Sequence, residues 1–253
     1  MTASIVRCPL NTIFMKIFTL SLLLVIVTLW GNAQNIIKPG DDIIRYDLIK
    51  PSHDFYKAVI TDTAGNSLYE FMMEDVTSVD LINKRITFAR SRQVPIGSFS
   101  TDTSFTDLVF RPIRMHEIYQ QRNVSFEMSF GDTLASVKTI RKGEASVKNH
   151  PMKSGYFENN MIEYIFGYLV LKKGVTYVLD NFNKDTDTPS DPYHIEYAFD
   201  DVWDLAGGYK LSCSVIHFVH GAGSGYIWVD KSTHQMVKEE GSFKGGVFVI
   251  TKV

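Results

Sequence analysis

The sequence has little cysteine, and its charges of opposite sign nearly balance. Two cysteines in 253 residues cannot build a disulfide-stapled framework. The formal net charge is −2, whereas binding to nucleic acid phosphates needs a clear cationic excess. The chain is 45% hydrophobic and 13% aromatic, which excludes a disordered or collagen-like protein. We therefore expect a globular protein that does not bind nucleic acid.

Long apolar runs are also lacking. The longest covers fourteen residues, 17–30, and a bilayer span needs roughly 20. Its length is typical of the hydrophobic region of a signal peptide, and Lys16 supplies the positive charge that precedes such a region. Gly31 and Ala33 are small residues that suit cleavage before Gln34. We predict that residues 1–33 form a signal peptide, with an uncleaved anchor as the alternative.

Export has consequences for the mature chain. Met15 is a possible true start, so the segment before it need not be part of the natural leader. Cleavage removes Arg7 and Lys16 from the 26 basic residues and leaves 24 against 28 acidic ones. A lipoprotein needs cysteine at its first mature position, which Gln34 does not provide. We expect a periplasmic or extracellular protein that is not lipidated and has no transmembrane segment after cleavage.

Alternation of apolar and polar residues dominates the mature sequence. It is strict over 124–130 and again over 193–199, which predicts strands with one buried face. Turn-forming residues such as Gly131-Asp132 and Gly245-Gly246 separate these strands from other β-rich runs. The further runs are 53–61, 68–76, 84–92, 111–121, 134–141, 175–182, 209–219, 225–229, 235–241 and 247–252.

One segment, residues 159–170, has helical spacing instead. Its apolar residues are Ile162, Ile165, Phe166 and Leu169. Asn159 or Asn160 suits the N-cap, and the 172–174 sequence Lys-Lys-Gly suits the end of a helix. A proline at Gly167 would break a helix of this extent.

Together these patterns predict the fold class. Short connections without helical crossovers indicate an antiparallel sheet, and a sheet of this size must curl, close or split. We predict a mainly β (α+β) protein, in which residues 34–253 form a single domain. This domain is a curled antiparallel sheet, or half-barrel, of about 10–12 strands with one short helix packed on it.

Candidate catalytic and metal-binding motifs are weak. A nucleophile elbow around Ser224 would need glycine at position 222, where the sequence has alanine. His217 and His220 lie three residues apart on a strand, so they should point to opposite faces and could not bind one metal ion together. Residues 185–196 resemble a calcium loop, but serine replaces the required glycine at position 190. Cys213 fits a buried apolar position. We assign no catalytic residue, no metal site and no cofactor.

A group of acidic residues leaves one enzymatic alternative open. Asp200, Asp201 and Asp204 interrupt the alternation of a strand, which a bulge or a strand end would explain. Paired carboxylates can also hydrolyse glycosides, so a hydrolase that uses this region remains an alternative hypothesis.

The abundance of aromatic residues favours a binding function. A curled sheet has a concave face, and incomplete filling of that face leaves an apolar cavity that could hold an acyl chain or an apolar peptide segment. The candidate ligand-binding residues are Phe126, Met128, Phe130, Ile165, Phe166, Tyr197, Phe199 and Trp228. The alternative is a completely filled core, with a structural or protein-interaction role carried by an edge strand or a loop.

Two stretches carry a family resemblance. Gly155–Tyr177 joins the short helix to a strand through Leu-x-x-Gly, and Gly225–Gly241 is a strand, a turn led by Asp230 and a second strand. Together they resemble exported β proteins that are similar to the LolA/LolB-like lipoprotein-carrier half-barrels. The order of elements fits over most of residues 40–253. The resemblance implies a non-enzymatic envelope protein whose partner is a lipid, a lipoprotein or a hydrophobic polypeptide.

Overall fold

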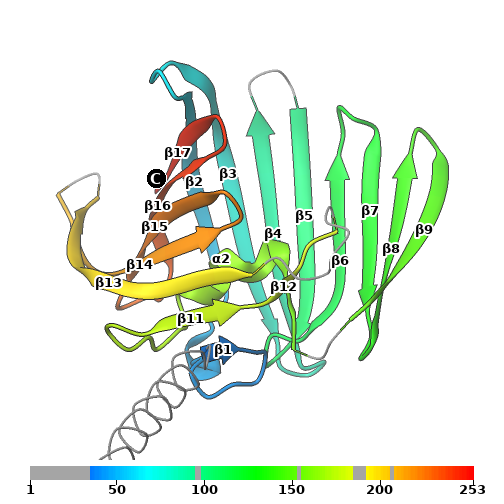
Figure 1. Cartoon of the computed structure of the whole chain (residues 1–253), viewed down its shortest axis with the longest axis horizontal. Coiled ribbons are helices and arrows are strands. Elements are labelled where there is room, and N and C mark those ends of the chain that lie inside the picture. The colour runs from blue at the N-terminus through cyan, green and yellow to red at the C-terminus, as the bar shows by residue number, and fades with distance from the viewer. Residues whose placement is uncertain (1–34, 95–97, 153–154, 185–191, 206–207) are drawn as a thin grey trace, which may run out of the picture. The chain divides into compact units, whose positions relative to one another are not determined.

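Strands that follow one another in the sequence pair into one curled antiparallel sheet (Figure 1). The computed structural model describes residues 35–94, 98–152, 155–184, 192–205 and 208–253. The predicted signal peptide and positions 185–191 of the calcium-loop comparison lie outside the described residues. Residues Ile36–Val253 form one compact unit.

The main sheet has fifteen strands and is not closed into a barrel. From β11 to β9 all pairings are antiparallel, and the pairing of β17 with β2 joins the C-terminal strands to the N-terminal ones. In sheet order the strands are β1 (Asn35–Ile37), β11 (Thr176–Leu179), β13 (Tyr193–Asp204), β14 (Lys210–His220), β15 (Gly223–Asp230), β16 (Met236–Phe243), β17 (Gly246–Lys252), β2 (Ser52–Asp62), β3 (Ser67–Asp80), β4 (Arg85–Val94), β5 (Ser98–Asp107), β6 (Pro112–Tyr119), β7 (Val124–Phe130), β8 (Leu134–Arg141) and β9 (Glu144–Pro151).

The remaining elements are short. A two-stranded parallel sheet pairs β10 (Phe157–Glu158) with β12 (Asn181–Phe182). The 3-10 helix η1 spans Tyr46–Leu48. A second 3-10 helix, η2 (Asn159–Met161), leads directly into the α-helix α2 (Ile162–Phe166). We call residues 157–169, which contain β10, η2 and α2, the plug.

The plug fills one half of the concave face. Met161, Ile162, Ile165 and Phe166 are at most 1% exposed, and they join a single core cluster with residues from both halves of the sheet. Among these are Phe88 on β4 and Ile227 on β15. The sheet therefore curls around the plug because both of its halves bury apolar side chains against the same short helix.

The helix is shorter than the sequence predicts. Glu158, and not Asn159 or Asn160, caps it: the Glu158 carboxylate accepts a hydrogen bond of 2.9 Å from the backbone N–H of Asn160. The α-helix ends at Phe166, because Gly167 lies directly against the β15–β16 turn. A Cβ atom at Gly167 would be 1.9 Å from the carbonyl oxygen of His234.

The predicted fold class is confirmed, and the strand count is higher than predicted. Four strands were not predicted, the short β1 and β10 and the longer β5 and β9. The run 175–182 is two strands, β11 and β12, which belong to different sheets. Of the two longer unpredicted strands, β5 turns polar residues inward, and β9 is exposed along almost its whole length, so neither has an apolar alternation. None of the helices in the described ranges has the length and apolar character that a membrane crossing requires.

Candidate ligand-binding site on the concave face

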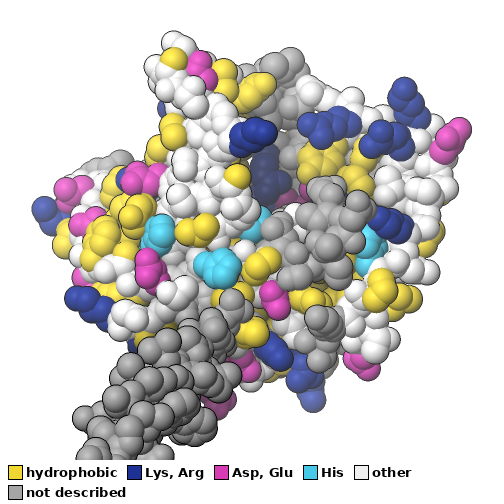
Figure 2. Space-filling model, viewed as in Figure 1, with side chains coloured by type: hydrophobic (Ala, Val, Ile, Leu, Met, Phe, Trp, Pro, Cys, Tyr) yellow, Lys and Arg dark blue, Asp and Glu magenta, His cyan; other side chains and the backbone are white. Residues whose placement is uncertain are grey.

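The half of the concave face that the plug does not cover has two hollows. The first, which we call the basic hollow, measures about 540 Å³ and lies at one end of β6, β7 and β8. Its lining combines three apolar or aromatic side chains with four basic ones: Tyr119, Val124, Phe126, Arg122, Arg141, Lys142 and Lys184. Figure 2 shows dark blue basic side chains around a yellow apolar area over β6–β9, in the upper right of the view.

Strand register places the lining of the basic hollow on the concave side. Val124 pairs with Tyr119 on one side and with Arg141 on the other, and residues that pair across strands share a face. Two residues along β7, Phe126 lies on that same face, and Met128 follows it into a small core cluster with Phe182 of β12. The hollow therefore opens toward the interior of the curled sheet.

A buried carboxylate organises the basic hollow. Glu117 is 3% exposed, accepts a hydrogen bond from the Tyr119 hydroxyl, and lies 2.7 Å from the Lys184 ammonium. The Lys184 nitrogen is also 4.8 Å from the centre of the Phe126 ring. Burial, together with the neighbouring Glu117 charge, raises the pKa of Tyr119 to about 12, so its hydroxyl stays protonated and continues to donate.

The other three basic residues of the hollow are not neutralised. Arg122 stacks over Tyr119, with its guanidinium carbon 5.4 Å from the ring centre. Within the part of the chain that the structure describes, Arg122, Arg141 and Lys142 form no salt bridge. Glu117, the buried carboxylate next to the hollow, already has Lys184 as its ion partner. The hollow thus has a positive rim above an aromatic floor.

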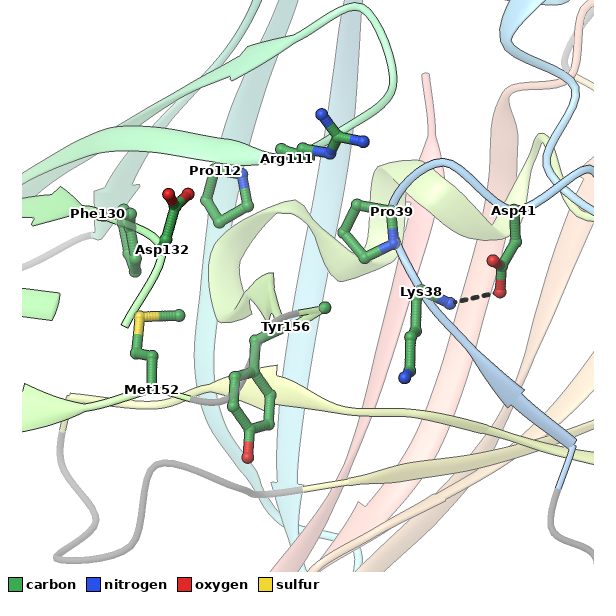
Figure 3. A pocket seen from close by; sticks show the side chains of 11 residues that line it. Lys38, Pro39, Asp41, Arg111, Pro112, Phe130, Asp132, Met152 and Tyr156 are labelled. Atoms are coloured by element: carbon green, nitrogen blue, oxygen red, sulfur yellow. Dashed lines mark hydrogen bonds between the residues drawn. The ribbon is translucent and has the colours of Figure 1, made fainter. Parts of the chain in front are cut away.

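The second hollow, which we call the turn hollow, measures about 470 Å³ and is drawn in Figure 3. Phe130, Met152 and Tyr156 give it an apolar side, and Arg111 and Asp132 project into it from the turns between strands. Phe130 packs edge-on against Phe182, with ring centres 5.6 Å apart.

β7 connects the two hollows. Its concave-facing residues are Val124, Phe126, Met128 and Phe130, which we call the β7 strip. Val124 and Phe126 line the basic hollow, Phe130 lines the turn hollow, and Met128 is buried between them. Six residue steps of a strand extend about 20 Å. The strip therefore reaches from one hollow to the other, and in its middle Met128 is buried in a cluster with Phe182.

The plug is anchored to the sheet by buried charges. Arg90 on β4 forms two hydrogen bonds of 2.7 Å to Asp75 on β3 and a further one to Glu163 on α2. Next to this group, Ser104 on β5 donates a hydrogen bond to Glu158 of the plug. All but Glu163 are less than 9% exposed, so the concave face of β3–β5 binds the plug through polar contacts.

Burial shifts the acidity of these carboxyl groups in different directions. It raises the pKa of Glu158 to about 7 and that of the nearby Glu239 well above its ordinary value. Burial also pushes the pKa of Glu163 upward, but the charge of Arg90 and its hydrogen bond outweigh this effect and lower the pKa. Glu163 is therefore held as a carboxylate, whereas Glu158 can keep its proton in weakly acidic solution.

The structure brings together some of the predicted ligand-binding residues and separates others. Phe126, Met128 and Phe130 form the β7 strip. Ile165 and Phe166 belong to the plug and lie in the main core, and Phe166 also borders a hollow of about 310 Å³ next to β14–β17. These five residues thus occupy two separate regions of the concave face.

Phe199 and Trp228 lie on the outer face of the sheet. A bulge between Tyr197 and Phe199 reverses the alternation of β13, so that Tyr197 pairs with the core residue Ile216 whereas Phe199 pairs with Val215. Trp228 belongs with Val215 to a separate small cluster and donates a hydrogen bond of 2.9 Å to Asp201. A strand bulge does explain the acidic interruption at residues 200–204, and Asp200 itself forms an ion pair with Lys231.

The basic residues of the hollow were missed in the sequence. Arg122 lies in the β6–β7 turn, Arg141 is the last residue of β8, and Lys142 lies in the β8–β9 turn, so Arg122 is about twenty positions from the other two. The strict alternation of 124–130 did indicate Phe126. It could not indicate which turns would meet beside it, because that depends on the register of three strands. In the described ranges, no three His, Cys, Asp or Glu side chains are grouped so that they could hold a metal ion.

The fold and the site define a class of protein: an open, β-barrel-like sheet whose interior is partly filled by a plug. The family model described as "Protein of unknown function (DUF3108)" matches residues 58–251, and the chain belongs to this family. No curated protein matches the sequence. The resemblance to the lipoprotein carriers stays a prediction.

Two solved structures are similar to this chain. One is a β-barrel-like protein of the DUF1849 family from Brucella abortus, with a TM-score of 0.54 and 10% identity over 83% of this chain and 97% of that one. The other is a DUF1329 family protein from Desulfovibrio piger, with a TM-score of 0.27 and 13% identity over 84% of this chain and 92% of that one. The first similarity shows a shared β-barrel-like fold.

Proposed function

We propose that the protein is an exported, non-enzymatic binding protein that holds an acyl chain or lipid along the β7 strip. The observation that supports this proposal is the position of the strip. Its apolar side chains extend between the basic hollow of about 540 Å³ and the turn hollow of about 470 Å³. An elongated apolar ligand would fit such a surface better than a compact polar one, because each end of the strip opens into space.

The expected affinity follows from the area that the ligand removes from water. An acyl chain that buries roughly 300 Å² of apolar surface gains about 7 kcal/mol at about 25 cal/mol per Å². A free energy of that size corresponds to a Kd on the order of micromolar, before the cost of ordering the chain is subtracted. Binding should therefore be reversible, as is required of a protein that receives and releases its ligand.

Mass spectrometry of the purified protein tests the proposal directly. Organic extraction of protein from an exporting host should release a lipid or fatty acid, and intact-mass measurement should give a chain that begins at Gln34. An extract without lipid, from protein that also fails to bind an added fluorescent fatty acid, would refute the binding proposal. Recovery of a hydrophobic peptide in place of a lipid would show that the apolar ligand is a peptide segment.

A matched pair of phenylalanine variants locates the site. Phe126 is half-buried at the floor of the basic hollow, and Phe199 is 46% exposed on the outer face. Phe126→Ala should weaken binding of a fluorescent fatty acid about tenfold, because the side chain contributes on the order of 1.5–3 kcal/mol when it is covered by a ligand. Phe199→Ala should leave the Kd unchanged. Equal affinities in both variants, at unchanged Tm, would place the ligand elsewhere.

An interaction or structural role is the second candidate, and the packing of the plug favours it. Met161, Ile162 and Ile165 are fully buried, so the space between α2 and the sheet is occupied by side chains. In that half of the molecule, function would depend on the outer surface. A protein that binds no apolar ligand but is captured by a partner through the exposed outer face would support this alternative.

A further inference from the structure

We propose that the basic hollow is a head-group site, and that the ligand of the β7 strip is an anionic amphiphile. In this arrangement the acyl chain lies against Val124 and Phe126 of β7, and a phosphate or carboxylate group lies among Arg122, Arg141 and Lys142. This inference rests on the proposed function and specifies the chemical class of its ligand.

The concentration of positive charge supports an anionic head group. The whole chain has a net charge of −2, yet four basic side chains line this one hollow. Glu117, the buried carboxylate beside them, is already engaged by Lys184 and Tyr119. An anion that enters the hollow therefore meets uncompensated positive charge, and charge-assisted hydrogen bonds to guanidinium and ammonium groups are strong.

The backbone holds the basic residues at one place. The N–H of Lys142 donates a hydrogen bond of 3.0 Å to the carbonyl of Asn123, which ties the β8–β9 turn to the β6–β7 turn. Lys142 has a φ of 52°, in the left-handed region that favours glycine or asparagine. The lysine at this position thus gives the hollow a positive charge at a place where local backbone geometry would prefer another residue.

The apolar floor supports an amphiphile over a free anion. Arg122 and Lys184 lie against the faces of Tyr119 and Phe126, so the positive groups border an aromatic surface. That surface includes Val124 and Phe126, the two residues of the β7 strip that line the hollow. A small inorganic anion would satisfy the charges but leave this apolar surface uncovered.

Three probes with shared chemistry distinguish the possible ligands. Lysophosphatidic acid and lysophosphatidylcholine with the same acyl chain, used below their critical micelle concentrations, differ in net head-group charge, and inorganic phosphate has no chain. We expect the wild-type protein to bind lysophosphatidic acid roughly tenfold more tightly than lysophosphatidylcholine, which is the effect of one charge-assisted contact. This preference should decrease as salt is added, because salt screens the rim. Inorganic phosphate alone should bind far more weakly than either.

Variants in the turns test whether the rim causes the preference. The double variant Arg141→Gln with Lys142→Asn removes two charges, and asparagine tolerates the left-handed backbone at position 142. It should abolish the preference for lysophosphatidic acid, because it weakens binding of lysophosphatidic acid far more than that of lysophosphatidylcholine, whose phosphate is already balanced by choline. Lys138→Gln is the matched control on β8: Lys138 pairs with Glu127 at 3.1 Å, away from the hollow, so its removal should change neither affinity.

Each outcome decides between the two proposals. Equal binding of both lysolipids by the wild-type protein would overturn the head-group inference and leave the acyl-chain proposal standing. Binding of inorganic phosphate as tight as that of lysophosphatidic acid would retain an anion site and overturn the acyl-chain proposal. Binding of none of the three probes would overturn both. A preference that survives in the double variant would place the head group outside the basic hollow.

Discussion

The buried carboxyl group of Glu158 makes the stability of this fold depend on pH in a predictable direction. Glu158 is 1% exposed, and burial raises its pKa from 4.5 to about 7. Because the folded pKa lies above the unfolded one, the native state holds the proton more tightly than the unfolded chain does. The resulting stability is fully present below about pH 4.5 and is lost as the pH rises through about 7.

The magnitude follows from the size of the pKa difference. A difference between 4.5 and about 7 corresponds to about 3 kcal/mol, at 1.36 kcal/mol for each pKa unit. Glutamine at position 158 is neutral at every pH and has nearly the same shape, and its amide can still bond to Ser104 and to the N–H of Asn160. We therefore expect Glu158→Gln to be about as stable as wild type at pH 5 and about 3 kcal/mol more stable at pH 8.

Urea unfolding at several pH values between 5 and 8 measures the effect. The difference between the two proteins isolates Glu158, because Glu239 and Asp102, whose pKa values burial also raises, are present in both. Glu163, whose pKa is lowered, loses its contribution only as the pH falls toward more acidic values, outside the measured interval. If the stability difference between variant and wild type is the same at pH 5 and pH 8, Glu158 does not hold its proton and the reasoning is wrong.

Two further predictions concern the seating of the plug. Gly167→Ala should destabilise the protein by about 1–3 kcal/mol or more in urea unfolding, because the added Cβ would lie 1.9 Å from the carbonyl oxygen of His234. Gly131→Ala is the control: its Cβ would lie 3.5 Å from the nearest atom, so the free energy of unfolding should be nearly unchanged. Arg90→Met should cost about 3–5 kcal/mol, since it leaves two buried carboxylates without their partner, and a loss below 1 kcal/mol would mean that this ion group does not hold the plug.

The effect expected at Gly167 shows where the reasoning from sequence was incomplete. The helical spacing of residues 162–169 predicted a helix that would break at a mid-helix proline. The helix does form, but it ends at Phe166, and Gly167 is its C-cap. Position 167 is sensitive to substitution because the β15–β16 turn lies against it. The two contacting segments are more than sixty residues apart in the sequence, so local periodicity cannot reveal the contact.

Alternation identified strands where one face is apolar, and it failed where the inward face is polar. The strand over residues 124–130 was predicted because its inward residues are apolar, and these inward residues form the β7 strip. β5 was not predicted, because its inward residues Asp102, Ser104 and Thr106 are polar. Asp102 and Ser104 bond to Arg92 and Glu158, and Thr106 bonds to the backbone carbonyl of Asp107. Burial of paired polar groups is invisible to a pattern that counts only hydrophobic residues.

Single-residue irregularities limited the prediction of the site more than composition did. In β13 the bulge near Tyr197 turns Phe199 to the outer face, although the sequence alternates strictly over residues 193–199. A shift of one residue in a strand moves every later side chain to the opposite face. The sequence therefore could identify aromatic candidates on this strand but could not assign them to the concave or the outer face.

The division of the concave face explains how one sheet could combine a fixed interior with a binding surface. β3–β5 turn buried charges toward the plug, and Arg90 and Ser104 bind its two glutamates. β7, outside the reach of these anchors, turns apolar residues inward and has open space at both ends. A ligand at either end of the β7 strip would therefore not have to displace the plug, whereas contact with Met128 would require Phe182 to move. Binding would then leave the buried ion group intact. The micromolar affinity proposed above depends on this, because the cost of breaking that group would be subtracted from the binding free energy.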